Sequence, residues 1–260
     1  MNVKIIVDST VDMPGSCQDQ VSVVPLTVRF GDEEYLDGVT IDRARFYERL
    51  VESDTLPSTS QATPDAFAAL FEQVKQEGGS AVVITISSKL SGTYQSACLA
   101  AEEYRNIYVV DSQTAAIGSG ILAEYALRCA KEGLDAAAIA AQLERKKSDI
   151  CLVALLDTLE YLKKGGRISK TAALAGGLLN IKPVVTVQDG EVVLIGKARG
   201  SKQGNNLLVE KILACGGIDF SMPLLLGYSG LSDALLKKYV EDSSALWRGQ
   251  TQTLESTMIC

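Results

Sequence analysis

The stretch that decides the fold reads Ala81-Val82-Val83-Ile84-Thr85-Ile86 and continues as Ser87-Ser88-Lys89-Leu90-Ser91-Gly92-Thr93-Tyr94-Gln95-Ser96-Ala97. Its first six residues are mostly apolar and β-branched without a helical period, which predicts a strand buried on both faces. Residues 94–104 are rich in Ala and Glu and predict a helix. The Ser/Gly/Thr cluster between them therefore lies at the carboxyl end of a parallel strand, where helix N–H groups favour an anion.

A helix cap is the alternative explanation for Ser91 in this stretch. Serine is common at the N-terminal cap of a helix, where its hydroxyl accepts a backbone N–H. One cap needs one hydroxyl, however, and residues 87–96 hold four serines and a threonine. We therefore favour an anion site at this edge of the sheet.

The composition limits the class of protein. The chain has 260 residues, of which 47% are hydrophobic and 22% charged, which is typical of a soluble globular protein. The net charge of −7 argues against nucleic-acid binding. No apolar run is long enough to span a bilayer, and residues 1–10 lead directly into a strand without a signal-peptide pattern. We expect a cytoplasmic protein.

Cysteine and histidine narrow the possible chemistry. Six cysteines are scattered without a C-x-x-C pair, so we expect most of them to be small core residues. The chain contains no histidine, which removes Ser-His and Cys-His nucleophile systems and histidine-ligated metals. The G-x-S-x-G, S-x-x-K and Walker motifs are also missing. We expect no catalytic residue, no metal and no cofactor.

The pattern of the first part of the chain predicts a parallel sheet covered by helices on both faces. Apolar strands are expected at residues 1–7, 81–86, 107–110 and 150–156, and helices at 65–77, 94–104, 118–132 and 135–147. A surface hairpin is expected at residues 26–36, a helix beginning at Asp42 and a loop at 57–64.

The pattern changes after Asp157. We expect a hairpin around Asp189-Gly190, followed by alternating helices and strands at residues 205–215, 223–228, 232–243 and 251–259. The sequence thus predicts an α/β fold with two domains. Residues 1–156 form an N-terminal parallel-sheet three-layer domain, and residues 157–260 form a second α/β domain with a mixed or antiparallel sheet.

Three polar clusters are expected to converge between the domains, at residues 58–63, 87–93 and 165–170. The first two are hydroxyl-rich, and the third supplies Arg167 on a glycine turn. Hydroxyls, helix N–H groups and one arginine make a receptor for a carboxylate or phosphate. Taken singly, Thr59 and Ser60 fit turn chemistry and Arg167 fits a solvated surface charge.

Two other patterns have plainer explanations. Asp8 and Asp111 each end a strand, which is compatible with a magnesium site, but Ser9 and Ser112 beside them favour turn-forming hydrogen bonds. Gly118-Ser119-Gly120 imitates part of a dinucleotide-binding fingerprint. It stands several residues past its strand and is followed by a second helix, so we set that interpretation aside.

Six short motifs follow one another along the chain: Asp8-Ser9-Thr10, Thr59-Ser60-Gln61, Ser87-Ser88-Lys89-Leu90-Ser91-Gly92-Thr93-Tyr94, Asp111-Ser112, Lys164-Gly165-Gly166-Arg167-Ile168 and Asn180-Ile181-Lys182-Pro183. Each is weak alone, but the ordered set covers essentially the whole chain and resembles the DegV family. The resemblance implies a DegV-like fatty-acid-binding protein. The best understood members are the lipid-carrying subunit of bacterial fatty acid kinase.

The resemblance also implies where the ligand lies. The carboxyl group of a long-chain fatty acid would sit between the domains, and its tail would enter the second domain. By motif match, Ser91 and Thr59 hold the carboxylate, with Gly92 nearby and Arg167 close to the head group. The expected ligand-binding residues are Thr59, Ser60, Ser91, Gly92, Thr93 and Arg167.

One departure from the family concerns histidine. The family usually continues past the last strand with a Gly-Pro-Gly-containing segment whose histidine also touches the carboxylate, whereas this chain ends at Cys260. Either that segment is missing from this gene product, or this member holds its ligand with fewer donors.

The acyl tail has candidate lining residues in the second domain. We expect Ala172 to Leu179, with Ile181, Val185, Val193 and Ile195, to line a tunnel for the tail or to be ordinary core.

We expect a non-catalytic carrier that presents its lipid to a fatty acid kinase catalytic subunit for conversion to an acyl phosphate. Contact with membranes would be transient. A basic rim that could meet the kinase is formed by Lys163, Lys164, Arg167 and Lys170. One alternative is an enzyme acting on a small carboxylated or phosphorylated substrate with Ser91 in its site, and another is a plain interaction domain.

Overall fold

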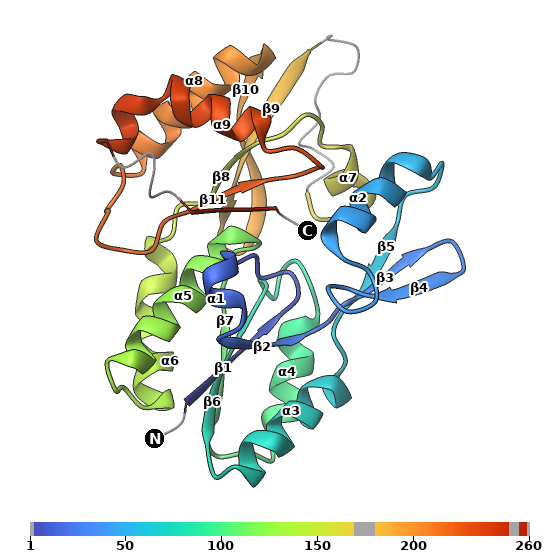
Figure 1. The fold of residues 1–260 in the computed structure, drawn as a ribbon, viewed down its shortest axis with the longest axis vertical. Helices are drawn as coiled ribbons and strands as arrows, with labels where there is room; N and C mark the ends of the chain where they lie inside the picture. Colours follow the sequence, from blue (N-terminus) through green and yellow to red (C-terminus); the bar gives the residue numbers. More distant parts are fainter. Residues whose placement is uncertain (1–2, 169–179, 250–254, 259–260) are drawn as a thin grey trace.

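The computed structural model describes residues 3–168, 180–249 and 255–258. Its central feature is a sheet of four parallel strands in the order β2-β1-β6-β7. The strands are β1 (Val3–Asp8), β2 (Val21–Val24), β6 (Ser80–Thr85) and β7 (Ile107–Asp111). Their carboxyl ends all meet at one edge of the sheet (Figure 1), as the sequence predicts for β1, β6 and β7. Strand β2 was not expected from the sequence.

Helices cover both faces of this sheet and make it the middle of three layers (Figure 1). On one face α5 (Ile117–Lys131) and α6 (Ala136–Lys146) pack over Ile5, Val7 and their neighbours. On the other face α3 (Pro64–Gln76) and α4 (Thr93–Ala101) pack over Ile6 and its neighbours. Successive strand residues thus enter opposite cores, which is why these strands read as continuous apolar runs.

The helix starts follow from local sequence. The side chain of Asp42 caps α2 (Arg43–Glu52) by accepting the Arg45 N–H, and Thr63 caps α3 in the same way, with Pro64 at the first helical position. Asp135 caps α6. The helices expected at these positions are therefore confirmed. Short helical turns occur at α1 (Gly15–Gln18) and η1 (Lys147–Asp149).

A small antiparallel sheet projects from the parallel-sheet domain together with α2 (Figure 1). The expected hairpin is present as β3 (Thr27–Phe30) and β4 (Glu33–Leu36). The expected loop at residues 57–64 is wrong at its start, because β5 (Ser58–Ser60) pairs with β3. All three β5 residues are polar and exposed. The sequence therefore lacks the alternation of apolar and polar residues that would predict a strand there.

The second half of the chain builds an antiparallel sheet in the order β10-β9-β8. Its strands are β8 (Val153–Leu155), β9 (Ile181–Gln188) and β10 (Glu191–Arg199), and α8 (Gly200–Ala214) packs on one face. The strand expected at residues 150–156 forms, but it pairs with β9 and does not extend the parallel sheet. The domain division at residues 156 and 157 stays a prediction.

The turn between β9 and β10 is the one the sequence predicts. Asp189 and Gly190 have φ values of +51° and +83°, the left-handed conformations that a tight hairpin requires. A two-stranded parallel pair completes the fold, because β11 (Leu225–Tyr228) lies beside β12 (Glu255–Met258). The remaining helices are α7 (Glu160–Lys164), α9 (Ala234–Asp242) and η2 (Ser244–Trp247). The α/β fold with parallel and antiparallel sheets agrees with expectation.

The cysteines differ from expectation. Cys151 and Cys215 form a disulfide and both residues are exposed, whereas Cys129 is buried and Cys17 and Cys98 are half-buried. The expectation that most cysteines are core residues is therefore wrong among the described positions. Cys151 and Cys215 stand just before β8 and just after α8, outside the apolar faces of both elements.

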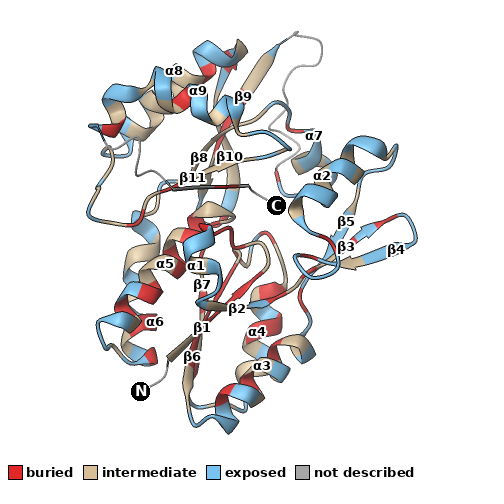
Figure 2. Cartoon of the chain, in the orientation of Figure 1, coloured by how far each residue is buried: buried red, intermediate tan, exposed pale blue. Residues whose placement is uncertain are grey.

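Burial is concentrated on the parallel sheet and the helix faces that cover it (Figure 2). Residues 81–85 of β6 are all buried, whereas residues 192–196 of β10 are all only partly buried. Within residues 3–168, 180–249 and 255–258, every helix is too short or too polar to cross a membrane.

Candidate functional site

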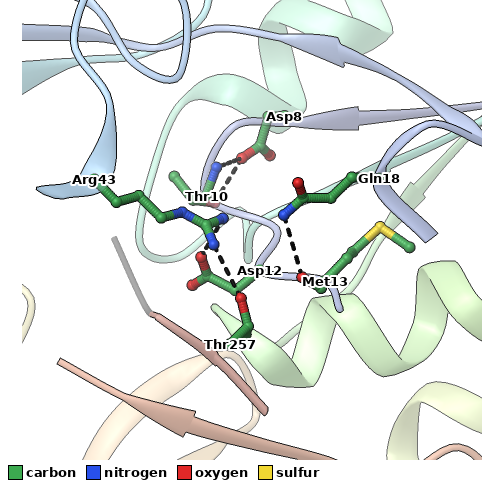
Figure 3. A network of polar contacts seen from close by, with 7 residues as sticks. All are labelled: Asp8, Thr10, Asp12, Met13, Gln18, Arg43 and Thr257. Carbon is green, nitrogen blue, oxygen red and sulfur yellow. Dashed lines mark hydrogen bonds and ion pairs between the residues drawn. The ribbon is translucent and has the colours of Figure 1, made fainter. Parts of the chain in front are cut away.

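Three strand ends build the floor of the site. The carboxylate of Asp8, at the end of β1, accepts the Thr10 N–H at 2.9 Å (Figure 3). It also accepts the Ile86 N–H at 2.7 Å. Burial raises the pKa of Asp8, and the hydrogen bonds from Thr10 and Ile86 oppose that rise. Asp8 therefore joins the loop after β1 to the loop after β6.

Asp111, at the end of β7, also accepts backbone N–H groups, and it joins the loop after β7 to the loop after β6. Its Oδ1 accepts the Ser88 N–H at 3.1 Å and the Gln113 N–H at 3.0 Å. Both aspartates thus form turn-stabilising hydrogen bonds, as the sequence favours. Across the described ranges, no group of three Cys, Asp or Glu side chains gathers as a metal site would require.

Two hydroxyls lie next to each other where α4 begins. The Oγ of Ser91 and the Oγ1 of Thr93 are 2.9 Å apart, and Ser91 Oγ also accepts the Thr93 N–H at 3.3 Å. Thr93 is fully buried and Ser91 is half-buried. Gly92 between them is the N-terminal cap residue. Ser91 therefore contacts the first N–H of the helix, as the capping interpretation expects, and belongs to a hydroxyl pair at the sheet edge.

Gln61 connects the β5 segment to this helix, and sequence reasoning did not name it as a site residue. Its Nε2 donates to Ser96 Oγ at 2.9 Å, and the Ala62 N–H donates to Thr93 Oγ1 at 3.4 Å. A Cβ added to Gly92 would lie 1.9 Å from the Gln61 Oε1. The Thr59-Ser60-Gln61 motif was the available signal. The structure thus brings residues 58–63 and 87–93 together, with the Thr59 and Ser60 side chains exposed.

Arg167 brings the third cluster to the same place. Its Nε donates to the Leu90 carbonyl at 3.2 Å, and its guanidinium also donates to the Gly165 carbonyl. Gly166 has a φ of +74°, so the turn requires a residue without a side chain. Because Arg167 is itself exposed, its charge stands at the rim of the site. Lys170 lies outside the described residues.

A buried contact between the two halves of the chain was not foreseen. The Ser87 hydroxyl donates to the Gly190 carbonyl at 2.7 Å, and Ser87 is fully buried. A Cβ on Gly190 would lie 2.6 Å from Ser87 Oγ. The β9–β10 turn therefore docks onto the loop that carries Ser91. The two partners are 103 positions apart, so no local pattern reveals their contact.

The Gly118-Ser119-Gly120 motif serves close packing at the start of α5. A Cβ on Gly120 would lie 2.0 Å from the Asp12 carbonyl oxygen, and one on Gly118 would lie 2.3 Å from Thr114 Oγ1. Ser119 forms a buried hydroxyl pair with Ser112 at 3.0 Å. Packing explains these glycines without a nucleotide.

The second sheet offers an apolar face near the site. A cluster there joins strand residues to α7 and to the turn after it: Val185, Leu159, Ile168, Ala154, Leu156, Leu162, Val192 and Leu194. Val185 pairs with Leu194, whereas Val193 pairs with Thr186. Val185 and Val193 therefore point to opposite faces, and only one of them can line a cavity on a given face. Residues 172–179, also expected to line the tail, lie outside the described residues.

An open pocket of about 340 Å³ borders this cluster at α7. It is lined by Thr158, Leu159, Glu160, Lys163 and Lys164. Lys164 is ion-paired with Glu160 at 2.7 Å. The pocket shares Leu159 with the apolar cluster, and none of its lining residues is an expected head-group residue.

Comparison with known proteins assigns the family. The DegV family, described as uncharacterised proteins, matches residues 2–255. This chain belongs to the DegV family. A DegV domain-containing protein of Caldanaerobacter subterraneus is 35% identical over 223 residues, which cover 84% of this chain and 79% of the relative. The resemblance read from the six motifs is therefore confirmed.

Solved structures share the DegV fold. A DegV family protein from Thermus thermophilus, described as fatty acid binding, matches with a TM-score of 0.85 and 31% identity over 100% of this chain and 93% of that one. The Fatty Acid Kinase B3 protein of Streptococcus pneumoniae, loaded with linoleic acid, matches with a TM-score of 0.81 over 100% and 92% of the two chains. At 24% identity, the second match shows the fold alone.

Proposed function

We propose that this DegV protein binds a long-chain fatty acid, with the carboxylate at the hydroxyl pair of Ser91 and Thr93 and the tail along the second sheet. The observation that carries the proposal is this pair, 2.9 Å apart at the start of α4, on the loop that Ser87 joins to the β9–β10 turn. The fatty acid bound by the Thermus relative supports the ligand class. Thr59, Ser60, Gly92 and Arg167 complete the proposed head-group site.

The two ends of such a ligand would contribute differently. Burying a methylene contributes about 0.8 kcal/mol, so a tail of roughly a dozen gives about 10 kcal/mol before the costs of ordering. A hydrogen bond to the charged carboxylate adds about 1.5–3 kcal/mol. The tail would supply most of the affinity, and the polar groups at the sheet edge would fix which end of the lipid reaches the surface.

The proposal includes a partner. The protein would act in the cytoplasm without catalysing a reaction, touch membranes only transiently and present its carboxylate to a fatty acid kinase subunit that forms the acyl phosphate. The family resemblance supports this role, and the shared fold of the kinase B3 protein is compatible with it. Lys163, Lys164 and Arg167 at the rim are the candidate contacts.

Local geometry favours a binding role for Ser91 over a nucleophilic one. A serine nucleophile needs an adjacent base within hydrogen-bond reach. Among the described residues, the partners of Ser91 Oγ are the Thr93 hydroxyl and the Thr93 N–H. Neither the Thr93 hydroxyl nor the Thr93 N–H accepts a proton at neutral pH, so neither can act as the base. Their contacts with Ser91 suit a site in which hydroxyl groups are oriented to donate to a carboxylate.

The test is a titration with a fluorescent sixteen-carbon fatty acid. Ser91→Ala should weaken binding at least about tenfold, because one hydrogen bond to a charged acceptor contributes about 1.5–3 kcal/mol. Ser88→Ala is the matched control, since it keeps the Ser88 N–H bond to Asp111. Equal affinity of Ser91→Ala and wild type would contradict the placement of the head group, and a wild type that binds no fatty acid would contradict the function.

A further inference from the structure

Arg43, the first residue of α2, contacts two other parts of the chain (Figure 3). Its Nη2 forms an ion pair with Asp12 Oδ1 at 2.8 Å, and its Nη1 donates to Thr257 Oγ1 at 3.0 Å. Asp12 lies in the loop after β1, and Thr257 lies in β12, 214 positions after Arg43. One guanidinium therefore bridges three segments that are distant in sequence.

The bridge is largely shielded from water. The Asp12 side chain is 1% exposed and that of Arg43 is 25% exposed, and Thr257 is buried. A buried ion pair is sensitive to loss of either partner because the remaining charge stays in a poorly solvated place. Exposed pairs lack this sensitivity. The contact of Arg43 with Asp12 is thus suited to hold its segments in one arrangement.

Asp12 is itself fixed to the parallel-sheet domain. Its N–H donates to the Ala116 carbonyl at 3.4 Å, and its own carbonyl lies against Gly120 of α5, where a Cβ would come within 2.0 Å. Arg43 is therefore paired with a residue, Asp12, whose backbone packs closely against α5.

Arg43 belongs to a unit formed by β3, β4, α2 and β5, here called the β3–β5 unit, which also carries an expected head-group residue. In the described part of the chain, β3, β4 and β5 pair only with one another, and their small core consists of Val28, Phe30 and Ile41 with Tyr35 and Phe46. Thr59 lies on β5 of this unit. Gln61 and Ala62 tie the unit to α4 on one side, and Arg43 ties it to Asp12 on the other.

We propose that Arg43 is a positioning residue that latches the β3–β5 unit and strand β12 to the loop after β1, and so keeps the two halves of the molecule closed. Arginine suits the role because its planar fork serves two acceptors in fixed directions, which a lysine ammonium does not. The latch is a property of the fold, and its effect on lipid rests on the proposed function.

Hydrogen exchange of the lipid-free full chain tests the latch. In Arg43→Ala, amides of β12 and of residues 9–13 should exchange at least tenfold faster than in wild type, while those of α3 stay unchanged. Arg45→Ala is the matched control, because Arg45 lies on the same helix in an exposed pair with Glu48 and should change neither segment. Thr257→Val keeps the pair of Arg43 with Asp12 and should accelerate β12 alone.

Lipid release provides the second readout. The fluorescent fatty acid should dissociate about tenfold faster from Arg43→Ala and at the wild-type rate from Arg45→Ala. Unchanged exchange of β12 in both Arg43→Ala and Thr257→Val overturns the latch, even if lipid binds. If Arg43→Ala does not fold, Thr257→Val decides. A wild type that binds no fatty acid overturns the proposed function and leaves the exchange result to judge the latch.

Discussion

The parallel sheet is more deeply buried and more tightly packed than the β8–β9–β10 sheet. Residues 81–85 of β6 are completely shielded between two helix layers, whereas residues 192–196 of β10 are all half-buried. Loops at the edge of the first sheet are tied together by the carboxylates of Asp8 and Asp111, and Ser87 joins one of these loops to the β9–β10 turn. A tightly packed interior resists change in volume. Under the proposed function, the first sheet would be a fixed platform for the polar head and the second sheet a more adaptable surface for the acyl chain.

Two glycines show the same difference in packing between the two regions. Gly120 faces backbone, since its Cβ would lie 2.0 Å from the Asp12 carbonyl oxygen and 3.0 Å from the Asp12 carbonyl carbon. Gly196 on β10 faces a side chain, because its Cβ would meet the Leu207 Cδ2 at 2.7 Å. A methyl at the end of a flexible side chain can move aside, whereas a backbone carbonyl held by α5 cannot.

The largest effect should therefore come from Gly120→Ala. We expect it to lower the free energy of unfolding by about 2 kcal/mol, since overpacking costs up to about 3 kcal/mol and helix propensity offsets about 1 kcal/mol. Gly196→Ala should change it by less than about 1 kcal/mol. Urea unfolding followed by circular dichroism measures both, and fluorescence of Trp247, the single tryptophan, reports on the second half. Equal losses of unfolding free energy in the two variants would contradict the difference in packing between the two regions.

A smaller effect is expected where the two regions meet. Ser87→Ala removes the donor to the Gly190 carbonyl and leaves that buried oxygen unpaired, so we expect a loss of about 1–2 kcal/mol in the free energy of unfolding. Ser88→Ala, on the same loop, should lose less than about 0.5 kcal/mol. Trp247 fluorescence during urea unfolding records the difference. Identical midpoints for the two variants would show that the β9–β10 turn does not depend on Ser87.

The sequence was most informative where local chemistry decides the structure. Strands β1, β6 and β7 were predictable because buried β-branched runs have few other uses, and the β9–β10 turn was predictable from Asp189-Gly190. The sequence also predicted that the Ser/Gly/Thr cluster lies at the start of the helix after β6, whereas the direct contact between the Ser91 and Thr93 hydroxyls came from the structure. The roles proposed for these hydroxyls stay predictions.

What escaped prediction depends on distant partners. Strand β5 is polar throughout and exists because β3 offers it an edge, and β8 joins β9 because of contacts that form only in the folded chain. The disulfide between Cys151 and Cys215 joins residues 64 positions apart. The bridge of Arg43 with Asp12 and Thr257 spans three segments. Periodicity and capping rules describe neighbours in sequence, so they carry no information about such pairs.

The most direct measurement locates the tail end of a bound fatty acid. A sixteen-carbon fatty acid with a photoreactive diazirine on its last carbon would be bound to the full chain, illuminated and located by peptide mass spectrometry. We predict adducts in the second half of the molecule, within residues 153–199, and competition by unlabelled fatty acid. Adducts confined to residues 58–63 and 87–93 would place the tail where the head group is proposed and contradict the account.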